Sequence, residues 1–157
     1  MIIIDTREQA NVHILRYLDK NGIEHGDNAL DFGDYLNTEN GIVVERKKNF
    51  TELAGNCGKG HARFKLDLER LDTAGGKMYV LVEQEGGFDA LQAWENPRGK
   101  PKQRILKRGV VKPVQPMSGA QIAAICQRWQ ERHNVEFVFC SRRESPQTLC
   151  RLLGVEL

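Results

Sequence analysis

Two short charged motifs joined by a turn constrain the fold of this chain more than any other feature. The first is Gly33-Asp34-Tyr35 and the second is Glu45-Arg46-Lys47. Residues 37–41 between them are rich in types that reverse the chain, so the two segments should pair as antiparallel strands. Side chains alternate along a strand, which places Glu45 and Lys47 on one face and Arg46 on the other. The pattern predicts that Asp34 and Glu45 meet beside one lysine.

Two carboxylates and a lysine at one place favour a divalent-cation site. Mg²⁺ and Mn²⁺ prefer carboxylate oxygens and keep several waters, so Asp34 and Glu45 together with a substrate phosphate are a sufficient anchor. Lys47 would stabilise the charged phosphate or orient the attacking water. The pattern therefore indicates a metal-dependent nuclease centre. The alternative interpretation is a solvated strand face that carries Glu-x-Lys without any chemistry.

The opening segment adds more charged residues to this picture. The apolar run Ile2–Ile4 suits a buried strand and ends abruptly in Asp5-Thr6-Arg7-Glu8. Charges at the end of a buried strand are typical of a functional site. They are equally consistent with a capping cluster before a helix that starts near Asn11.

The three motifs, in this order, resemble the nuclease domain of the XPF family of structure-specific endonucleases. That family is a branch of the restriction-endonuclease-like PD-(D/E)xK superfamily. Arg63-Phe64, the segment 77–83 and the segment 135–141 also resemble parts of its pattern, so the likeness covers nearly the whole chain. The resemblance implies an α/β fold, with a restriction-endonuclease-like central mixed sheet flanked by helices, as a single XPF-type nuclease domain over residues 1–157.

The resemblance also implies roles for individual residues. Asp34 and Glu45 would bind Mg²⁺ or Mn²⁺, Lys47 would assist the chemistry, and Asp5 and Glu8 would complete the acidic catalytic cluster. Arg7 would hold a carboxylate or a phosphate, and Arg46 would serve structure or contact the DNA backbone.

Two positions depart from the family pattern. Thr51 stands where the family has an aspartate, with an acid only at the next residue, Glu52. Asp67 stands where many members carry a glutamine. Glu52 could substitute for the missing acid, and Asp67 could alter substrate contacts or belong to a helix surface. Neither departure changes the expected metal ligands.

Basic residues are concentrated in one segment, about 96–113, which also contains several prolines and glycines. The net charge of +2 is too small to indicate nucleic-acid binding by itself, but this segment carries a run of cations without an intervening acid. It should be a loop or hairpin that contacts DNA phosphates, or else a merely solvated loop. A smaller basic group lies near the expected site and consists of Lys59, His61 and Arg63. The predicted DNA-binding residues of the large segment are Arg98, Lys100, Lys102, Arg104, Lys107 and Arg108.

The composition is that of an ordinary globular domain. The chain has 157 residues, of which 40% are hydrophobic and 28% charged, enough to bury one core. No apolar stretch reaches the length of a bilayer span and no signal peptide is evident, so we expect no membrane contact and a cytoplasmic location. A compact, stand-alone nuclease domain of the XPF type would suit a bacterial or bacteriophage protein. The four cysteines are scattered, which argues against a disulfide framework, and Cys57 with His61 is only half of a zinc pattern.

The remaining pattern is an alternation of strands and helices. We expect strands at 1–5, 77–82 and 135–140 and a helix over 11–21. Phe64, Leu68 and Leu71 indicate a second helix, which follows a glycine-rich stretch over 55–60. Within that stretch, residues 58–60 suggest a mobile loop. Ser118 with Gln121 predicts a capping box at the start of a third helix, and Ser145-Pro146 begins a closing helix.

The expected substrates, by resemblance, are branched or flap and fork junctions in DNA repair or recombination. Relatives usually gain junction selectivity from a paired subunit and a helix-hairpin-helix module, for which this sequence leaves no room, so a homodimer or a partner subunit is expected. The alternatives are a non-catalytic DNA-binding subunit of a nuclease complex, or a homodimeric Holliday-junction resolvase. A phosphate-binding α/β enzyme unrelated to DNA is disfavoured, because no glycine loop follows the first strand.

Overall fold

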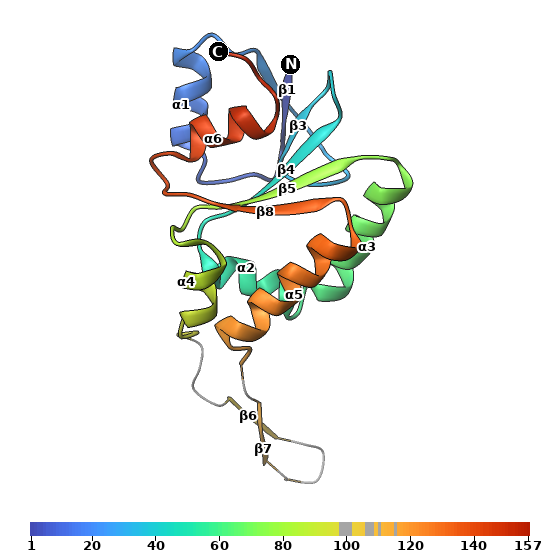
Figure 1. Ribbon diagram of the computed structural model, residues 1–157, viewed down its shortest axis with the longest axis vertical. Helices are drawn as coiled ribbons and strands as arrows, with labels where there is room; N and C mark the ends of the chain where they lie inside the picture. Colours follow the sequence, from blue (N-terminus) through green and yellow to red (C-terminus); the bar gives the residue numbers. More distant parts are fainter. Residues whose placement is uncertain (98–101, 106–108, 110, 115) are drawn as a thin grey trace.

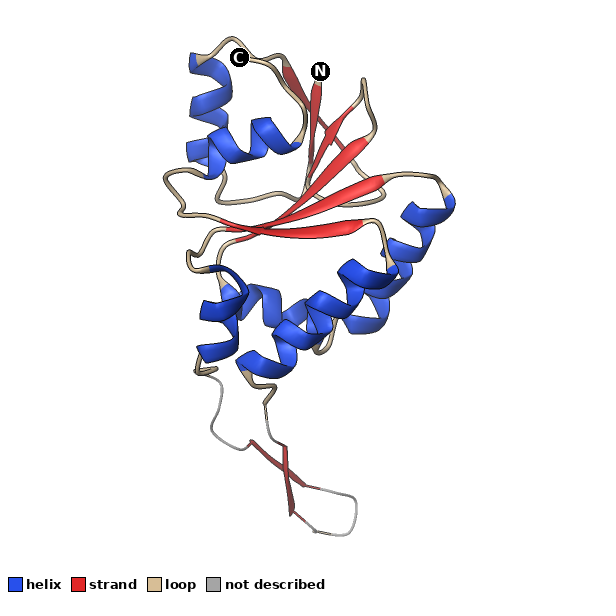
Figure 2. Cartoon of the chain, in the orientation of Figure 1, coloured by secondary structure: helices blue, strands red, loops and turns tan. Residues whose placement is uncertain are grey.

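A mixed β-sheet forms the centre of the molecule. The computed structural model describes residues 1–97, 102–105, 109, 111–114 and 116–157. Within this part of the chain, the sheet has six strands in the order β2-β1-β3-β4-β5-β8 (Figures 1 and 2). The strands are β1 Ile2–Asp5, β2 His25–Asn28, β3 Tyr35–Asn37, β4 Ile42–Lys47, β5 Lys77–Val82 and β8 Val135–Phe139.

Strand direction divides the sheet into a central antiparallel part and two parallel flanks. β3 pairs antiparallel with both β1 and β4, whereas β2 runs parallel to β1, and β5 runs parallel to β4 and β8. The expected antiparallel pairing of the two motif segments is confirmed. So is the α/β class with a mixed central sheet.

Helices cover both faces of the sheet, as Figure 1 shows. α1 and α6 lie on one face, and α2, α3, α4 and α5 lie on the other. Each of these two groups of helices packs over one hydrophobic core. Val44 packs into the first core and Val43 into the second, as expected for neighbours on a strand. The helices are α1 Val12–Lys20, α2 Phe50–Cys57, α3 His61–Thr73, α4 Gly87–Ala93, α5 Gly119–Arg132 and α6 Ser145–Leu152.

Several local predictions are confirmed. Ser118 accepts a hydrogen bond from the Gln121 N–H while the Gln121 side chain accepts one from the Ser118 N–H, which completes the capping box of α5. α6 begins at Ser145 with a proline in its first turn. The free cysteines form no disulfide in the described residues.

Helix α2 was not predicted from the sequence. α2 continues through Gly55 to Cys57, and only a short turn separates it from α3. Asn49 caps α2 by accepting from the Glu52 N–H, and the apolar residues Phe50, Leu53 and Cys57 are buried at helical spacing. These contacts outweigh the low helix propensity of glycine.

The basic segment contains a two-stranded ribbon outside the main sheet. β6 Lys102–Ile105 pairs antiparallel with β7 Val111–Val114, as a hairpin does. Four of the predicted DNA-binding residues, Arg98, Lys100, Lys107 and Arg108, lie outside the described residues. No helix among the described residues is long and apolar enough to cross a membrane.

Candidate active site

The β3–β4 hairpin places Asp34 opposite Glu45. Tyr35 pairs with Val44 in the register, so the preceding and following residues, Asp34 and Glu45, face each other across the strands. The Asp34 N–H donates to the Val44 carbonyl at 2.9 Å. In return the Arg46 N–H donates to Oδ2 of Asp34 at 2.7 Å. The backbone therefore orients the Asp34 carboxylate directly.

Gly33 allows this close approach of the two strands. Its φ is +66°, a conformation that favours glycine, and a Cβ at this position would lie 2.3 Å from Cγ1 of Val43. Steric overlap with Val43 therefore explains why the Gly-Asp-Tyr motif begins with glycine in this fold.

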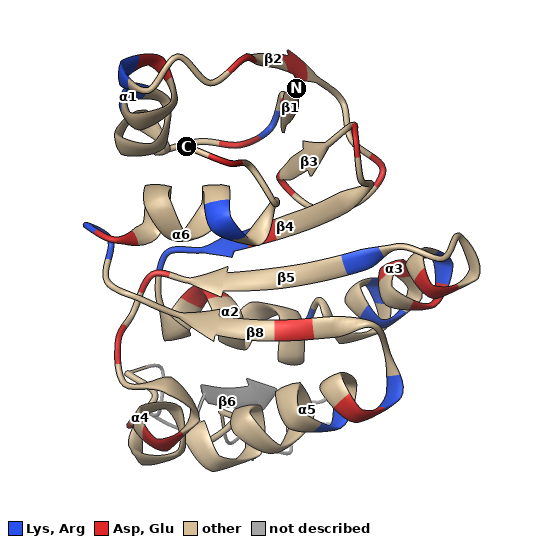
Figure 3. Ribbon diagram, turned by 45° about the horizontal axis from the view of Figure 1, so that its top comes forward, with Lys and Arg blue, Asp and Glu red and all other residues tan. Residues whose placement is uncertain are grey.

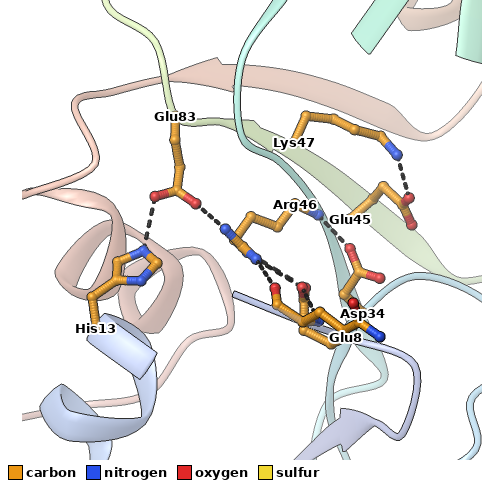
Figure 4. Close-up of polar contacts among 8 residues, drawn as sticks. Glu8, His13, Asp34, Glu45, Arg46, Lys47 and Glu83 are labelled. Atoms are coloured by element: carbon orange, nitrogen blue, oxygen red, sulfur yellow. Dashed lines mark hydrogen bonds and ion pairs between the residues drawn. The ribbon is translucent and has the colours of Figure 1, made fainter. Parts of the chain in front are cut away.

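Lys47 lies beside Glu45 on the same face of β4 (Figure 4). Its Nζ donates to Oε1 of Glu45 at 2.8 Å. Burial lowers the pKa of Lys47, but the carboxylates of Glu45 and Asp34 raise it more, so the net shift is upward. Lys47 therefore stays protonated at neutral pH and supplies a fixed positive charge.

Asp34 carries the most perturbed carboxylate of the site. Burial, and then the negative charges of Glu45 and Glu8, raise its pKa from 3.8 to about 8. Two opposed carboxylates with one lysine leave an excess of negative charge, which a cation would relieve.

Asp5 is not a free carboxylate of the acidic cluster, because it is paired with Arg7. Nε and Nη2 of Arg7 donate to its two carboxylate oxygens at 2.9 and 3.2 Å, and the Leu30 N–H donates at 3.0 Å. Burial alone would raise the pKa of Asp5, but these hydrogen bonds lower it overall. Asp5 thus holds Arg7, whose side chain remains 63% exposed at the cavity.

Glu8 is paired with Arg46, yet it lies close enough to Asp34 for its negative charge to raise the pKa of that carboxyl. The Arg46 side chain leaves β4 on the face opposite Glu45 and Lys47, where its Nη2 donates to Oε1 of Glu8 at 2.7 Å (Figure 4). Only 1% of the Arg46 side chain is exposed. Of the two roles predicted for Arg46, structural support and contact with the DNA backbone, this buried position favours structural support.

A cavity of about 340 Å³ opens over Asp34, Glu45 and Lys47. Arg63, one of the predicted DNA-binding residues, lines it, whereas Lys59 is exposed and does not. Helix α3 carries both basic and acidic residues, so it does not present a uniformly basic face (Figure 3). The other lining residues are Asp5, Arg7, Asp31, Gly33, Asn56, Gly60, Phe64, Asp67 and Met78.

The sequence did not single out Asp31 or Asn56 as site residues. Asn56 comes from α2, the helix that was not expected, and its Nδ2 is buried without a hydrogen-bond partner among the described residues. Asp67, from α3, lines the cavity. Glu52 lies close enough to Lys47 to raise its pKa, which keeps the expected substitution for Thr51 open.

The strand order and the hairpin carboxylates together define a restriction-endonuclease-like α/β domain. The ERCC4 domain family matches residues 4–152, nearly the whole chain, and the chain belongs to this family. The match confirms the resemblance to XPF-family nuclease domains. Membership places the chain in a nuclease family and implies binding to DNA. No match was found among curated proteins.

Proposed function

We propose that this chain is a metal-dependent DNA endonuclease that hydrolyses phosphodiester bonds, with Asp34, Glu45 and Lys47 at its centre. The observation that supports the proposal best is the register of the hairpin, which sets the two carboxylates opposite each other with Lys47 beside them. The proposed substrates are branched or flap and fork junctions in repair or recombination.

The donor set fits a divalent cation such as Mg²⁺ or Mn²⁺. The backbone occupies Oδ2 of Asp34 and Lys47 occupies Oε1 of Glu45, so Oδ1 and Oε2 have no hydrogen bond from the described residues. No group of three or more His, Cys, Asp or Glu side chains that could hold a metal was found in that part of the chain. Water and substrate phosphate would complete the coordination. When bound, the cation supplies positive charge and Lewis acidity next to the phosphodiester.

The protein's own cations would bind and orient the substrate. Lys47 is fixed by Glu45 and would contact a phosphate oxygen at the reacting centre. Arg7 is held by Asp5 yet exposed at the cavity, and Arg63 lines the same cavity, so both would contact neighbouring phosphates. Lys59 and the basic segment with Lys102 and Arg104 would extend this contact along the DNA.

A cleavage assay with matched variants tests the proposal. Labelled duplex, flap, fork and four-way DNA are incubated with wild type and with Asp34→Asn, Glu45→Gln and Lys47→Met, in Mg²⁺, Mn²⁺ or chelator. The controls are Lys77→Met and Glu136→Gln, which alter another Lys–Glu pair, with a separation of 3.7 Å, on the strands β5 and β8. We expect wild type and controls to cut only with metal, and each site variant to lose at least about 100-fold in rate.

Other outcomes identify the alternatives. Binding of these DNAs without cleavage by wild type would favour a non-catalytic subunit of a nuclease complex. Symmetric cutting of four-way junctions by a dimer, with the mass measured by light scattering, would favour a Holliday-junction resolvase. Cleavage that persists in chelator or in the Asp34→Asn variant would contradict the proposed centre.

A further inference from the structure

A buried charge network lies on the opposite face of β4 from the proposed metal centre. The Arg46 guanidinium contacts both Glu8 and Glu83, and its Nη2 also donates to the Gln9 carbonyl at 2.7 Å. Only 2% of the Glu83 side chain and 7% of the Glu8 side chain are exposed. The three charges thus satisfy one another away from water, and removal of one leaves the others unpaired.

His13 extends the network to helix α1. Its Nε2 lies 2.8 Å from Oε2 of Glu83, while Arg46 contacts the other oxygen of the same carboxylate (Figure 4). An ionised carboxylate only accepts hydrogen bonds, so Nε2 of His13 is the donor. Glu83 is therefore held from both sides, by a residue of α1 and by a residue of β4.

The network is connected to the metal centre through the backbone of β4. The Glu83 N–H donates to the Lys47 carbonyl at 2.8 Å, and the Arg46 N–H donates to Oδ2 of Asp34 at 2.7 Å. Glu45 and Lys47 are the immediate neighbours of Arg46. A displacement of the Arg46 side chain would therefore shift the strand that carries Glu45 and the donor that orients Asp34.

From these contacts we propose that Glu83 and His13 are positioning residues, which act through Arg46 to fix Asp34 and Glu45 for cation binding. The inference rests on the proposed function. Neither residue lines the cavity over Asp34, Glu45 and Lys47. Groups that orient metal ligands from behind typically change metal affinity or activity by about 10–100-fold when they are replaced.

The test measures direct Mn²⁺ binding by titration calorimetry as well as cleavage. Glu83→Gln keeps the shape but removes the charge, and His13→Ala removes the donor, whereas His13→Gln retains an N–H group that can reach Glu83. Glu136→Gln is the control for a charge change on a strand of the same sheet. We expect Glu83→Gln and His13→Ala to weaken Mn²⁺ binding and to lower kcat by about 10–100-fold, with KM for DNA unchanged. His13→Gln should recover most of both losses.

The readouts separate positioning from general destabilisation. Loss of folded protein would lower the number of Mn²⁺ sites and kcat together, without changing the affinity of the sites that remain, and that result would overturn the inference. Wild-type affinity and kcat in both variants would overturn it as well, while leaving the proposed function intact. A wild type that neither binds Mn²⁺ nor cuts DNA would overturn both.

Discussion

The backbone N–H of Arg46 donates to Oδ2 of Asp34 at 2.7 Å, while the Arg46 side chain lies in a buried ion network on the other face of the same strand. One residue thus links the orientation of a proposed metal ligand to the packing of the sheet against α1. A change at Arg46 should therefore affect both stability and activity. Substitutions on one face of β4 or the other should separate the two effects.

Asp34→Asn should stabilise the metal-free protein. A carboxyl whose folded pKa is raised from 3.8 to about 8 destabilises the folded state increasingly as the pH rises through that window, and the effect is constant above it. The amide removes this cost and still accepts the Arg46 N–H. In chelator, the free energy of unfolding of the variant should exceed that of wild type by an amount that grows between about pH 4 and pH 8, by at most about 1.4 kcal/mol per pH unit. Melting temperatures of both proteins across this pH range measure the trend. A variant less stable than wild type throughout this range would contradict the raised pKa.

Mg²⁺ should make wild type more stable than Asp34→Asn, the opposite of the order expected in chelator. A cation that binds only the folded state raises the melting temperature with its concentration. Wild type should therefore gain stability in Mg²⁺ at pH 8, whereas Asp34→Asn should gain much less. Calorimetric melting of both proteins across a Mg²⁺ series measures the difference, and equal gains would exclude Asp34 as a ligand.

Gly33→Ala should cost more stability than Gly41→Ala, although both glycines have a positive φ, of +66° and +72°. A Cβ at Gly41 meets nothing within 4 Å, whereas one at Gly33 would overlap Val43. The left-handed backbone costs about 1–2 kcal/mol in both variants, and the overlap adds about 1–3 kcal/mol in the first. Urea unfolding of the two variants gives the comparison; equal costs would mean that Val43 moves aside freely.

Arg46→Met should be strongly destabilising, because it leaves Glu8 and Glu83 buried without a counter-charge. The expected loss is about 3–5 kcal/mol, or about 6–20 °C in melting temperature. Arg70→Met, at an exposed position of α3, is the control and should change little. If Glu8→Gln and Glu83→Gln are added to Arg46→Met, part of the loss should be recovered. A further loss in that triple variant would show that shape, not charge, dominates here.

Asp72→Asn should weaken the protein above about pH 4 and have little effect below it. Burial raises the pKa of Asp72, but the Asn134 N–H and the His133 side chain lower it more, so the folded pKa lies below 3.8. Its stabilising contribution is therefore present above that value and is lost as the pH falls through the folded pKa. The difference should be about 0.2–1 kcal/mol for a partly exposed pair. Melting temperatures of both proteins from pH 3 to pH 7 measure it.

The parts of the site that depend on local pattern were predictable from the sequence. The period of two along Glu45-Arg46-Lys47, and the turn before it, fixed which side chains share a face, and the contact between Lys47 and Glu45 agrees with that prediction. The capping box of α5 was equally local. These features need only neighbouring residues and the geometry of a strand or a helix turn.

The parts that depend on distant contacts were not predictable. Glu83 meets Arg46 only because β5 lies parallel to β4, and no spacing in the sequence indicates that partner. α2 was missed because its glycine obscures an apolar pattern that is decisive only when packed against α5. Asn56 was missed with it. The split between Asp5, held by Arg7, and Glu8, held by Arg46, likewise follows from the tertiary arrangement.

The parallel alignment of β4 with β5 also has a kinetic consequence. The hairpin that sets Asp34 opposite Glu45 joins neighbouring segments, whereas Glu83, one of the partners of Arg46, follows β5, which α2 and α3 separate from β4 in the chain. Local pairings generally form before distant ones. We therefore expect changes in the hairpin turn to alter the rate of folding and changes at Glu83 to alter mainly the rate of unfolding. The two faces of β4 would then mark an early and a late stage in the assembly of the same site.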